Sequence, residues 1–429
     1  MNVIYMHTHD TGRYISPYGY DVPTPNLMDF TKEGTLFRKA FSAAPTCSPS
    51  RSALLTGLPP HQNGMIGLAH RGFRMHEMDK HIVRLMNDNG IETVLCGVQH
   101  VTHPDPSEIG YNRILSDKHY GADEENAKKA AKYIREKKSG SFFLSFGMSN
   151  THRDWPKADS DINQNYVMPP HPIPDNVASR KDYASYLTSA RRMDDCVGVL
   201  LDALSESGLE DETFIFFTTD HGLAYPNMKC NLYDTGIGVS LIIKYPGNRL
   251  KGCSSDSLVS HLDIFPTICD ILDIEEPDYI SGKSLVPLLD GSTNEIRDEI
   301  FAEVTYHAVY EPIRCIRTSR YKLIRYFDDC SYLPANVDGS EVKDFMAQSG
   351  FFERKHDRIM LFDLNLDPVE RVNLVNDPSY SKILAELSKK LEDWMRETCD
   401  PLLDGPVEKP LGAITNIRSC YSPRTQDFE

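Results

Sequence analysis

The chain has 429 residues, 40% hydrophobic and 25% charged, and its 62 acidic residues outnumber its 46 basic residues to give a net charge of −16. This length favours two or three domains with a large core, and the composition is that of a globular protein. An acidic chain is not expected to bind nucleic acid, whose partners carry basic surfaces, although one local basic pocket would suffice for an anionic substrate.

The N-terminus and the cysteines indicate the compartment. No apolar run is long enough to span a membrane. The opening residues, MNVIYMHTHD, lack the basic region, apolar region and cleavage site of a secretory leader. The ten cysteines are scattered without short paired spacings, which indicates reduced thiols and argues against a four-cysteine zinc site. We therefore expect a cytoplasmic protein, unless a leader has been removed.

Short apolar runs alternate with helical patterns over the first 295 residues. Two amphipathic helices are predicted, over residues 123–138 and 185–208, the second ending at Gly208. The runs with the branched and aromatic composition of buried parallel strands are NVIYM (2–6), TVLCG (93–97), FFLSFGM (142–148), TFIFFTT (213–219) and SLIIKY (240–245). This alternation predicts an α/β domain whose large, mixed but mostly parallel sheet is sandwiched by helices.

After about residue 295 the pattern changes. Residues 297–327 have the alternation of paired strands, and residues 378–400 form one long amphipathic pattern. We expect a smaller C-terminal α+β domain over residues 296–429, with a short antiparallel sheet and that helix packed on it. The Pro-rich segment VMPPHPIPD (167–175) is predicted to be a surface loop.

Histidines and aspartates follow four of the predicted strands. In chain order they are His7, His9 and Asp10; His100 and His103; His152, followed by Arg153; and Asp220 and His221. Because ligands of open α/β sheets bind beyond the carboxyl ends of the strands, one shared site is expected. Asp10 and Asp220 would repel each other unless a divalent cation neutralised them. Oxygen ligands suit Ca²⁺ or Mg²⁺, whereas added imidazoles suit Mn²⁺ or Zn²⁺. The alternative is that either aspartate only caps a helix.

The segment APTCSPSRSALLTG, residues 44–57, has the pattern of a helix start. Ser48 fits the N-cap of a helix over Pro49–Thr56. Cys47 would then lie just outside the helix N-terminus, a position that favours a thiolate and a bound anion. Arg51 would fall in the first turn, where the helix dipole disfavours a cation, and such a conflict favours a role in a site. The alternative is a buried thiol beside a helix cap.

This segment and three others resemble motifs of a known protein family. CSPSRSALLTG resembles the signature of the sulfatase family, of the alkaline-phosphatase-like superfamily, in which a dedicated enzyme converts the cysteine to formylglycine. THDTG and TTDHG are similar to the two metal motifs of that family, and LFDLNLDPVERVNL (361–374) is similar to its C-terminal element. Within the family, residues 55–68, 151–153 and 225–236 look most like the heparan N-sulfatase, or sulfamidase, branch.

The resemblance implies a role for each matching catalytic residue. Cys47, converted to formylglycine, would supply the nucleophile as its hydrate, and Arg51 would hold that group and screen its charge. Lys229 and His152 would contact the sulfate, with His152 as the acid for the leaving group. His100 would lie near the nucleophile and help to expel sulfate from the covalent intermediate.

The resemblance also implies a metal site. Asp10, Asp220 and His221 would bind a divalent cation, usually Ca²⁺ in this family. Two positions depart from the family pattern. His9 stands where the family has the first of its paired aspartates, and as a ligand it would move the preference toward Mn²⁺ or Zn²⁺. Val98 stands where the family usually has a lysine, unless it simply continues the buried strand.

The implied function of residues 1–295, the catalytic domain, is hydrolysis of a sulfate ester or sulfamate on a sulfated sugar or oligosaccharide. A formylglycine-generating enzyme would be a partner during maturation; nucleic acid and membrane-span partners are not expected. Candidate substrate-binding residues are Arg153, Glu303, Tyr306 and His307, and the last three have exposed strand positions as their alternative. Two other functions stay open: a phosphonate monoester or phosphodiester hydrolase of the same superfamily, and a non-catalytic sugar-binding descendant.

Overall fold

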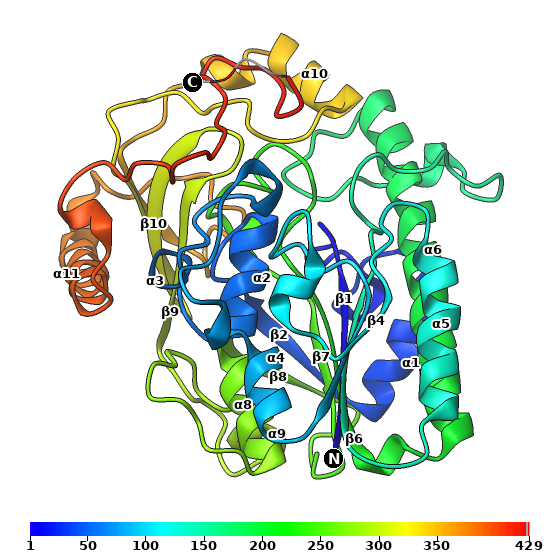
Figure 1. The fold of residues 1–429 in the computed structure, drawn as a ribbon. Helices are drawn as coiled ribbons and strands as arrows, with labels where there is room; N and C mark the ends of the chain where they lie inside the picture. The colour runs from blue at the N-terminus through cyan, green and yellow to red at the C-terminus, as the bar shows by residue number, and fades with distance from the viewer. Residues whose placement is uncertain (426–427, 429) are drawn as a thin grey trace.

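An eight-stranded sheet forms the centre of the computed structural model, which describes residues 1–425 and 428 (Figure 1). The strand order is β4-β3-β5-β1-β6-β7-β2-β8, and all neighbours are parallel except that β7 is antiparallel to both β6 and β2. The strands are β1 (Asn2–Thr8), β2 (Thr35–Phe41), β3 (Glu92–Gly97), β4 (Arg113–Ser116), β5 (Phe142–Gly147), β6 (Thr213–Thr219), β7 (Leu241–Lys244) and β8 (Cys253–Ser260).

The predicted large, mixed, mostly parallel sheet is confirmed, and all five predicted strands form. The direction of SLIIKY (240–245) differs from the prediction, because β7 is antiparallel. The connection from β6 stays at the carboxyl edge of the sheet, where Thr218 pairs with Leu241, so the chain re-enters the sheet in the opposite sense. Strands β2, β4 and β8 were not predicted, since their charged and hydroxyl side chains interrupt the apolar pattern.

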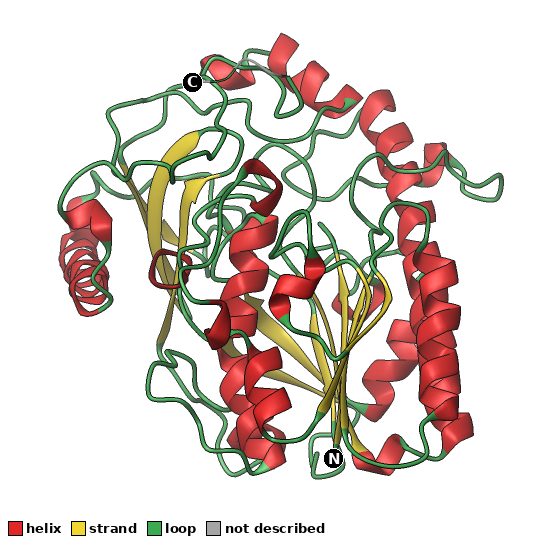
Figure 2. Cartoon of the chain, in the orientation of Figure 1, coloured by secondary structure: helices red, strands yellow, loops and turns green. Residues whose placement is uncertain are grey.

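Helices cover both faces of the sheet (Figure 2). Along β1, Ile4 and Met6 join the core of one face, and Val3 and Tyr5 join the core of the other, as strand alternation requires. The helices on the first face are α1 (Pro25–Glu33), α5 (Asp123–Glu136) and α6 (Val177–Ser207). Those on the second face are α2 (Cys47–Thr56), α4 (Ile82–Asp88), α8 (Ile264–Leu272) and α9 (Val286–Leu289).

Two predicted helices start earlier than expected. Helix α6 begins at Val177 rather than at residue 185, because Asn176 caps it by accepting a hydrogen bond from the backbone N–H of Ser179. Its predicted end is confirmed, with Gly208 in the left-handed conformation at φ 69°.

Helix α2 begins at Cys47 rather than at Pro49, with Thr46 in extended conformation before it. Cys47 therefore lies inside the first turn instead of just outside the helix, and Arg51 lies just beyond that turn.

A four-stranded antiparallel sheet of order β12-β11-β10-β9 forms the predicted C-terminal α+β part. Leu387, Leu391 and Met395 of α11 (Ser381–Glu397) pack on one face of it, which confirms the long helix predicted near the C-terminus. The other face packs against the larger part through Phe41 and Ile237. The strands are β9 (Glu299–Tyr306), β10 (Tyr310–Thr318), β11 (Tyr321–Tyr326) and β12 (Ile359–Asp363).

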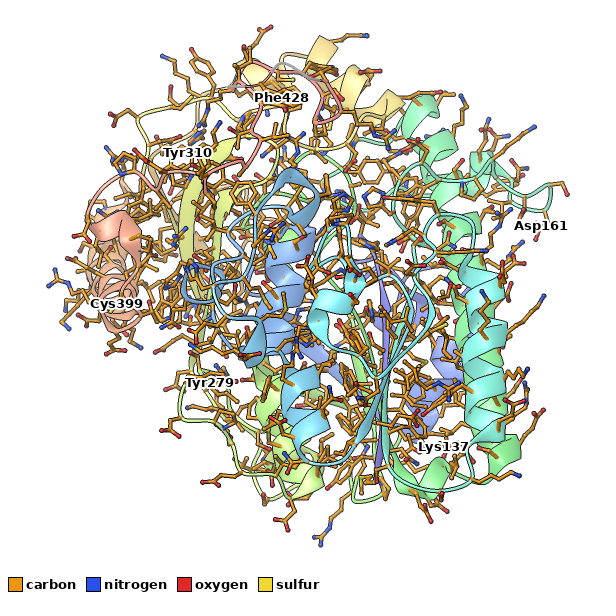
Figure 3. The ribbon with its side chains drawn as sticks, in the orientation of Figure 1. Lys137, Asp161, Tyr279, Tyr310, Cys399 and Phe428 are labelled. Atoms are coloured by element: carbon orange, nitrogen blue, oxygen red, sulfur yellow. The ribbon has the colours of Figure 1, made fainter. Side chains whose placement is uncertain are left out.

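Side chains fill the layers between each sheet and its helices, with Cys399 and Lys137 on opposite sides of the view (Figure 3). All ten cysteines are free thiols. Residues 167–175 form the predicted loop before α6. Within residues 1–425 and 428, no helix combines the length and apolar character needed to cross a bilayer. The remaining short helices are α3 (Pro60–Asn63), α7 (Asp234–Ile237) and α10 (Glu341–Gln348).

Candidate active site

Five adjacent parallel strands direct polar side chains to one edge of the large sheet. Strands β4, β3, β5, β1 and β6 are consecutive in it, so their carboxyl ends meet at the same edge. The residues that follow them are His119 and Tyr120; His100 and His103; His152 and Arg153; His9 and Asp10; and Asp220 and His221. A cavity of about 760 Å³ opens there, and Cys47 and Lys229 also line it. The sequence did not point to His119 and Tyr120, because the short β4 was not recognised.

Asp10 and Asp220 lie side by side beneath this cavity, fully buried. The backbone N–H of Asp10 donates to Asp220 Oδ1 at 2.8 Å. Lys229 Nζ donates to Asp10 Oδ2 at 2.9 Å, and Arg51 Nη2 donates to Asp220 Oδ2 at 2.9 Å. Burial acts to raise the pKa of each carboxyl, but Lys229 at Asp10, and His221 and Arg51 at Asp220, hold both pKa values below the ordinary one. Both side chains are therefore carboxylates.

The donor set at the two carboxylates fits a divalent cation. His221 Nδ1 donates to the carbonyl oxygen of Gly222 at 3.0 Å, so Nε2 is the ring nitrogen left to face Asp10. This Nε2 lies 3.3 Å from Asp10 Oδ1, a buried oxygen that accepts no hydrogen bond from any residue in the described chain. A buried carboxylate oxygen that has no donor and lies beside a ring nitrogen is suited to bind a divalent cation. His9 Nδ1 lies 3.1 Å from Asp220 Oδ2 and completes the set.

Cys47 occupies the first position of α2 and is buried, with Sγ 3.3 Å from His221 Nε2. Burial raises the pKa of its thiol well above the usual range, and the attraction of Lys229 does not offset this. The expectation of a thiolate at this helix start is therefore not met, because Asp220 and Asp10 add negative charge where water is excluded. The group at this position is a neutral thiol.

Arg51 joins the ends of two strands rather than contacting the thiol. Its guanidinium donates to His7 Nδ1, to the carbonyl oxygen of Thr8 at 2.6 Å and to Asp220 Oδ2 at 2.9 Å. Burial works against its charge, but Asp220 keeps the pKa of Arg51 above its usual value. The contacts of Arg51 in the described residues thus orient Asp220 and the end of β1, and Cys47 Sγ is not among its hydrogen-bond partners.

Imidazole rings form one wall of the cavity. The His9 ring lies 5.4 Å, between centroids, from the rings of both His100 and His152. His100 Nε2 lies 3.4 Å from His70 Nδ1. Burial lowers the pKa of His9 to about 3, that of His70 to about 4 and that of His100 well below its ordinary value. These three rings are neutral near pH 7.

His152 differs from the other rings in its orientation. Its Nδ1 donates to the carbonyl oxygen of Arg153, so Nε2 is the ring nitrogen that is free to give a proton to a bound ligand or take one from it. One of its ring nitrogens also lies within 4.8 Å of carboxylate oxygens of Asp10 and Asp338. Asp123 holds this loop by accepting from the backbone N–H of Ser149 at 2.8 Å.

Asp338 belongs to the site and was not predicted. It lies between β11 and α10 and accepts a hydrogen bond from Lys229 Nζ at 2.8 Å. Burial opposes its charge, yet Lys229 holds its pKa well below the ordinary value. Lys343 Nζ fixes the segment by donating to the carbonyl oxygens of Ala335 at 2.8 Å and Val337 at 2.7 Å. No local pattern marks Asp338, because only tertiary packing brings it to Lys229.

Two of the predicted substrate-binding residues, Arg153 and His307, line the cavity. Arg153 donates through both terminal nitrogens to Asp182, at 3.0 and 2.6 Å, and stacks on Trp155, so its charge is compensated within the protein. His307 Nδ1 lies 3.0 Å from the carbonyl oxygen of Asn336, and burial lowers its pKa to about 3.

Glu303 lies elsewhere, inside the contact between the two sheets. Its carboxylate accepts from the backbone N–H of His61 at 2.8 Å, lies 3.0 Å from the ring of His61 and pairs with Arg314 at 3.1 Å. It is only 2% exposed and does not line the active-site cavity. Tyr306 also points away, since its hydroxyl donates to the carbonyl oxygen of Val407 at 2.6 Å. Neither side chain is an exposed strand position, because this strand is covered on both faces.

Residues that the sequence did not single out form the rim of the cavity. Arg71 donates to Asn416 Oδ1 at 2.9 Å and to the carbonyl oxygen of Pro423. Arg424 pairs with Asp154 at 3.0 Å. The C-terminal tail therefore contributes to the rim although it is far from the other site residues in the sequence.

Val98 both continues the buried strand and borders the cavity, the two interpretations that the sequence left open. Its backbone N–H donates to the carbonyl oxygen of Gly147 at 3.0 Å, so it continues the pairing of β3 with β5. Its side chain also lines the cavity, which makes this part of the wall apolar rather than cationic.

Comparison with known families defines the class of the protein. Residues 1–274 match the family model described as "Sulfatase". Residues 227–351 match the model described as "N-sulphoglucosamine sulphohydrolase, C-terminal". Because the first match covers more than half of the chain, the chain belongs to the sulfatase family. It is an enzyme of the sulfuric ester hydrolase class, as this membership requires.

Individual relatives narrow the similarity. Human N-sulphoglucosamine sulphohydrolase is 28% identical over 452 residues, covering 91% of this chain and 89% of the human protein. A solved structure in complex with its substrate, D-glucosamine-2-N,6-O-disulfate, has a TM-score of 0.71 and 19% identity, covering 95% of this chain and 99% of that chain. A phosphonate monoester hydrolase of Agrobacterium radiobacter has a TM-score of 0.70 and 18% identity, with the same coverage. The fold alone therefore does not separate the two chemistries.

Proposed function

We propose that this enzyme removes a sulfate group, held as an ester or a sulfamate, from a sulfated sugar. The observation that carries the proposal is the cluster at the start of α2, where Cys47 meets two carboxylates, an imidazole nitrogen of His221 and the ammonium of Lys229. The similarity to human N-sulphoglucosamine sulphohydrolase favours a sulfamate on glucosamine as the first substrate to test. The apolar wall at Val98 is the feature that keeps phosphonate monoesters in the test.

Cys47 is proposed to act after conversion to formylglycine by a formylglycine-generating enzyme. The hydrate of that aldehyde supplies an oxygen nucleophile that the thiol itself lacks. Support comes from the raised pKa of the Cys47 thiol, since a neutral, buried thiol is a poor nucleophile. Its position beside His221 also places it next to the proposed cation site.

His9, Asp10 and Asp220, whose ligand atoms lie close together, would hold a divalent cation, which supplies positive charge beside the sulfate oxygens. His221 would join them through Nε2, which lies 3.3 Å from Asp10 Oδ1. We propose Ca²⁺ on the family pattern, and the two imidazoles make Mn²⁺ and Zn²⁺ the alternatives to test. The orphaned Asp10 Oδ1 is the atom of this chain that supports a bound cation most directly.

The proposed roles of Lys229, His152 and His100 follow from their hydrogen bonds and from the charge state of each side chain. Lys229 uses two of its three N–H groups on Asp10 and Asp338, so one is left to donate to a sulfate oxygen. His152, whose Nδ1 is already bonded, would as an imidazolium give its Nε2 proton to the leaving oxygen or nitrogen and become the neutral ring. His100 is neutral and half-buried, as a proton acceptor beside the nucleophile should be.

The test is an assay of protein made together with a formylglycine-generating enzyme. Mass analysis of the Cys47 peptide should show the loss of about 18 Da that converts the thiol to the aldehyde. This protein should release sulfate from N-sulfoglucosamine or a sulfate ester of a sugar faster than it cleaves a phosphonate monoester. Calcium, manganese and zinc are each returned after chelation to identify the ion.

Cys47→Ala should abolish turnover, whereas Cys253→Ser, at an exposed cysteine remote from the cavity, should leave it unchanged. Phosphonate turnover far above sulfate release would overturn the proposed substrate. Full activity from protein that contains only the unmodified thiol would overturn the role of formylglycine.

A further inference from the structure

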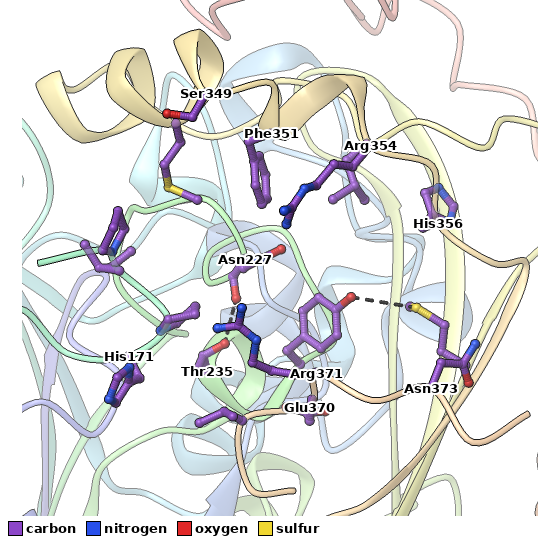
Figure 4. Close-up of a pocket in the computed structure, with 18 of the residues that line it drawn as sticks. His171, Asn227, Thr235, Ser349, Phe351, Arg354, His356, Glu370, Arg371 and Asn373 are labelled. Atoms are coloured by element: carbon purple, nitrogen blue, oxygen red, sulfur yellow. Dashed lines mark hydrogen bonds between the residues drawn. The ribbon is translucent and has the colours of Figure 1, made fainter.

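A second cavity, of about 670 Å³, shares no lining residue with the active-site cavity (Figure 4). Four segments and Leu333 surround it. The segments are the Pro-rich loop 168–175, the loop 227–235, the end of α10 with the residues after it (345–357), and the segment 360–373. The first and last of these stand out in the sequence but have no role in the proposed chemistry. A cavity of this size accommodates one or two sugar rings.

Two arginines approach this cavity from separate segments. Figure 4 shows the side chains of Arg354 and Arg371 extending toward Asn227 from opposite sides. Neither guanidinium has an ion pair or a hydrogen bond within residues 1–425 and 428, and both residues are exposed. Two unpaired guanidinium groups are a place for an anion, because each can donate two parallel N–H groups to a sulfate or carboxylate.

The acidic residues around the cavity do not cancel these charges. Asp175 is paired with Arg180, at 2.6 and 2.9 Å, and Glu370 is paired with Lys322 at 2.8 Å. Within the described part of the chain, the Asp357 carboxylate accepts a single hydrogen bond, from the side-chain amide of Asn373 at 2.7 Å. Among the described lining residues, Arg354, Lys355 and Arg371 therefore face one uncompensated carboxylate, in a chain whose net charge is −16.

The walls match a sugar ring rather than a bare anion. Phe351 and Tyr233 line the cavity, as do the aliphatic side chains of Ile173 and Met346. Aromatic faces pack on the C–H faces of sugar rings, and the side-chain amide of Asn227 and the hydroxyl oxygen of Thr235 offer partners for sugar hydroxyls.

We propose that this cavity binds an anionic unit of a saccharide chain, a ring that carries a sulfate or a carboxylate, apart from the sulfate removed at the active site. The choice of a saccharide rests on the proposed function, whereas the cavity and its charges do not. One loop contacts both sites, since Asn227 lines this cavity and Lys229 lines the active-site cavity. The enzyme would thereby recognise a chain and not only its terminal sugar.

The test measures binding to the full chain with Cys47→Ala, which prevents turnover. Calorimetry compares a heparin-derived hexasaccharide, a hyaluronan-derived hexasaccharide, the monosaccharide N-sulfoglucosamine and inorganic sulfate, at one ionic strength. The double variant Arg354→Gln/Arg371→Gln should weaken hexasaccharide binding about tenfold and lower the ratio of hexasaccharide to monosaccharide affinity. Tight binding of the heparin hexasaccharide alone assigns the anion as sulfate, and binding of both hexasaccharides assigns it as either group.

The control double variant is Arg192→Gln/Arg249→Gln, which removes the same charge at exposed arginines that line neither cavity. Equal weakening by this control would overturn the proposal, and so would inorganic sulfate that binds as tightly as the hexasaccharide. Hydrogen exchange provides a second readout: the hexasaccharide should protect residues 168–175 and 345–357, and the monosaccharide should not. Hexasaccharide binding without that protection also overturns it.

The outcomes separate this proposal from the proposed function. If the matured wild-type enzyme releases no sulfate from any saccharide while the arginine pair still determines hexasaccharide binding, the proposed function fails and the second cavity keeps its role. If sulfate is released normally but the double variant binds the hexasaccharide as the wild type does, the second cavity loses its role.

Discussion

The floor and the rim of the active-site cavity are built in opposite ways. The floor, which we define as Asp10, Arg51, Asp220 and Lys229, is buried, and each of its charges faces an opposite charge at 2.8–2.9 Å. The rim, which we define as His70, Arg71 and Arg424, is partly exposed. Among the described residues, the hydrogen-bond partners of Arg71 are neutral oxygens, and the Arg424 side chain is 56% exposed.

This difference separates two tasks. A floor whose charges are fixed by one another needs little reorganisation when charge develops on a reacting group, which is the condition for electrostatic stabilisation. A rim carried by loops and by the C-terminal tail is free to differ between enzymes that share the chemistry but not the substrate. Mutations should therefore cost most in the floor and least in the rim.

The largest effect is expected at Arg51. Arg51→Met leaves Asp220 buried without its cation, and breaking a buried pair from one side costs about 3–5 kcal/mol. Urea unfolding measures this loss in the free energy of unfolding. Arg249→Gln, at an exposed arginine, is the control and should change it by less than about 0.5 kcal/mol. A loss below about 1 kcal/mol for Arg51→Met would contradict the description of the floor.

Lys229→Met should lower kcat/KM about 10²–10³-fold, because under the proposed function it removes the donor to the sulfate oxygen on which charge develops. The variant also leaves Asp10 and Asp338 without a shared cation, so its folded fraction is measured by circular dichroism alongside the kinetics. Lys181→Met, at an exposed lysine paired with Glu341, is the matched control and should retain activity. A purely structural role for Lys229 predicts that kcat/KM per folded molecule stays near the wild-type value.

Glu303 is buried and paired with opposite charges, as the residues of the floor are, but it lies outside the active-site cavity. It therefore tests whether such pairing contributes to stability without contributing to activity. The ring and backbone of His61, together with Arg314, lower the pKa of this carboxyl from 4.5 to about 2 against the effect of burial. A lowered pKa in the folded state means that the stabilisation is present above pH 4.5 and is lost as the pH falls toward 2. The stability difference between wild type and Glu303→Gln, on the order of 3 kcal/mol near pH 7, should narrow over that interval.

Activity supplies the second half of this test. Glu303→Gln should leave KM for a sulfated monosaccharide unchanged in the folded fraction, because Glu303 does not line the cavity. Urea unfolding between pH 7 and pH 3 gives the stability difference. A difference that stays constant over the whole range would show that the ion pair is not the source of stabilisation.

The active-site residues that directly follow a strand or begin a helix could be predicted from the sequence. Cys47, Asp10 and Asp220 stand in short motifs at strand or helix ends, so their meeting at one edge followed from strand order. Residues that only tertiary packing brings to the cavity, such as Asp338 and Arg424, could not be predicted in this way. The direction of a strand in the sheet has the same limit: the apolar run of β7 predicts a buried strand but not whether it runs parallel or antiparallel to its neighbours.

Glu303 illustrates a related difficulty. Strand alternation predicts that one face of β9 is exposed, but the large sheet part covers one face and α11 covers the other. A charged residue on such a strand must find internal partners, and His61 and Arg314 provide them. Which of two covered faces borders a cavity depends on contacts far away in the sequence.

Asp338→Asn should lower kcat 10- to 100-fold, the usual range for groups that orient a catalytic side chain. Asn keeps the shape but removes the charge that holds Lys229 between two carboxylates. As a positioning residue, Asp338 should affect kcat more than KM, whereas a substrate contact would raise KM. Asp329→Asn, at an exposed aspartate paired with Arg358, is the control and should leave both parameters unchanged.

The smallest effect is expected at Arg424, where the contrast between floor and rim is sharpest. Its pair with Asp154 is exposed, and such pairs contribute about 0–1 kcal/mol, so Arg424→Gln should leave the free energy of unfolding nearly unchanged. If the rim selects among substrates, the same variant should raise KM for multiply sulfated sugars several-fold while kcat for a singly sulfated sugar stays constant. An equal loss of kcat on every substrate would place Arg424 with the floor, and the distinction between the two regions would fail.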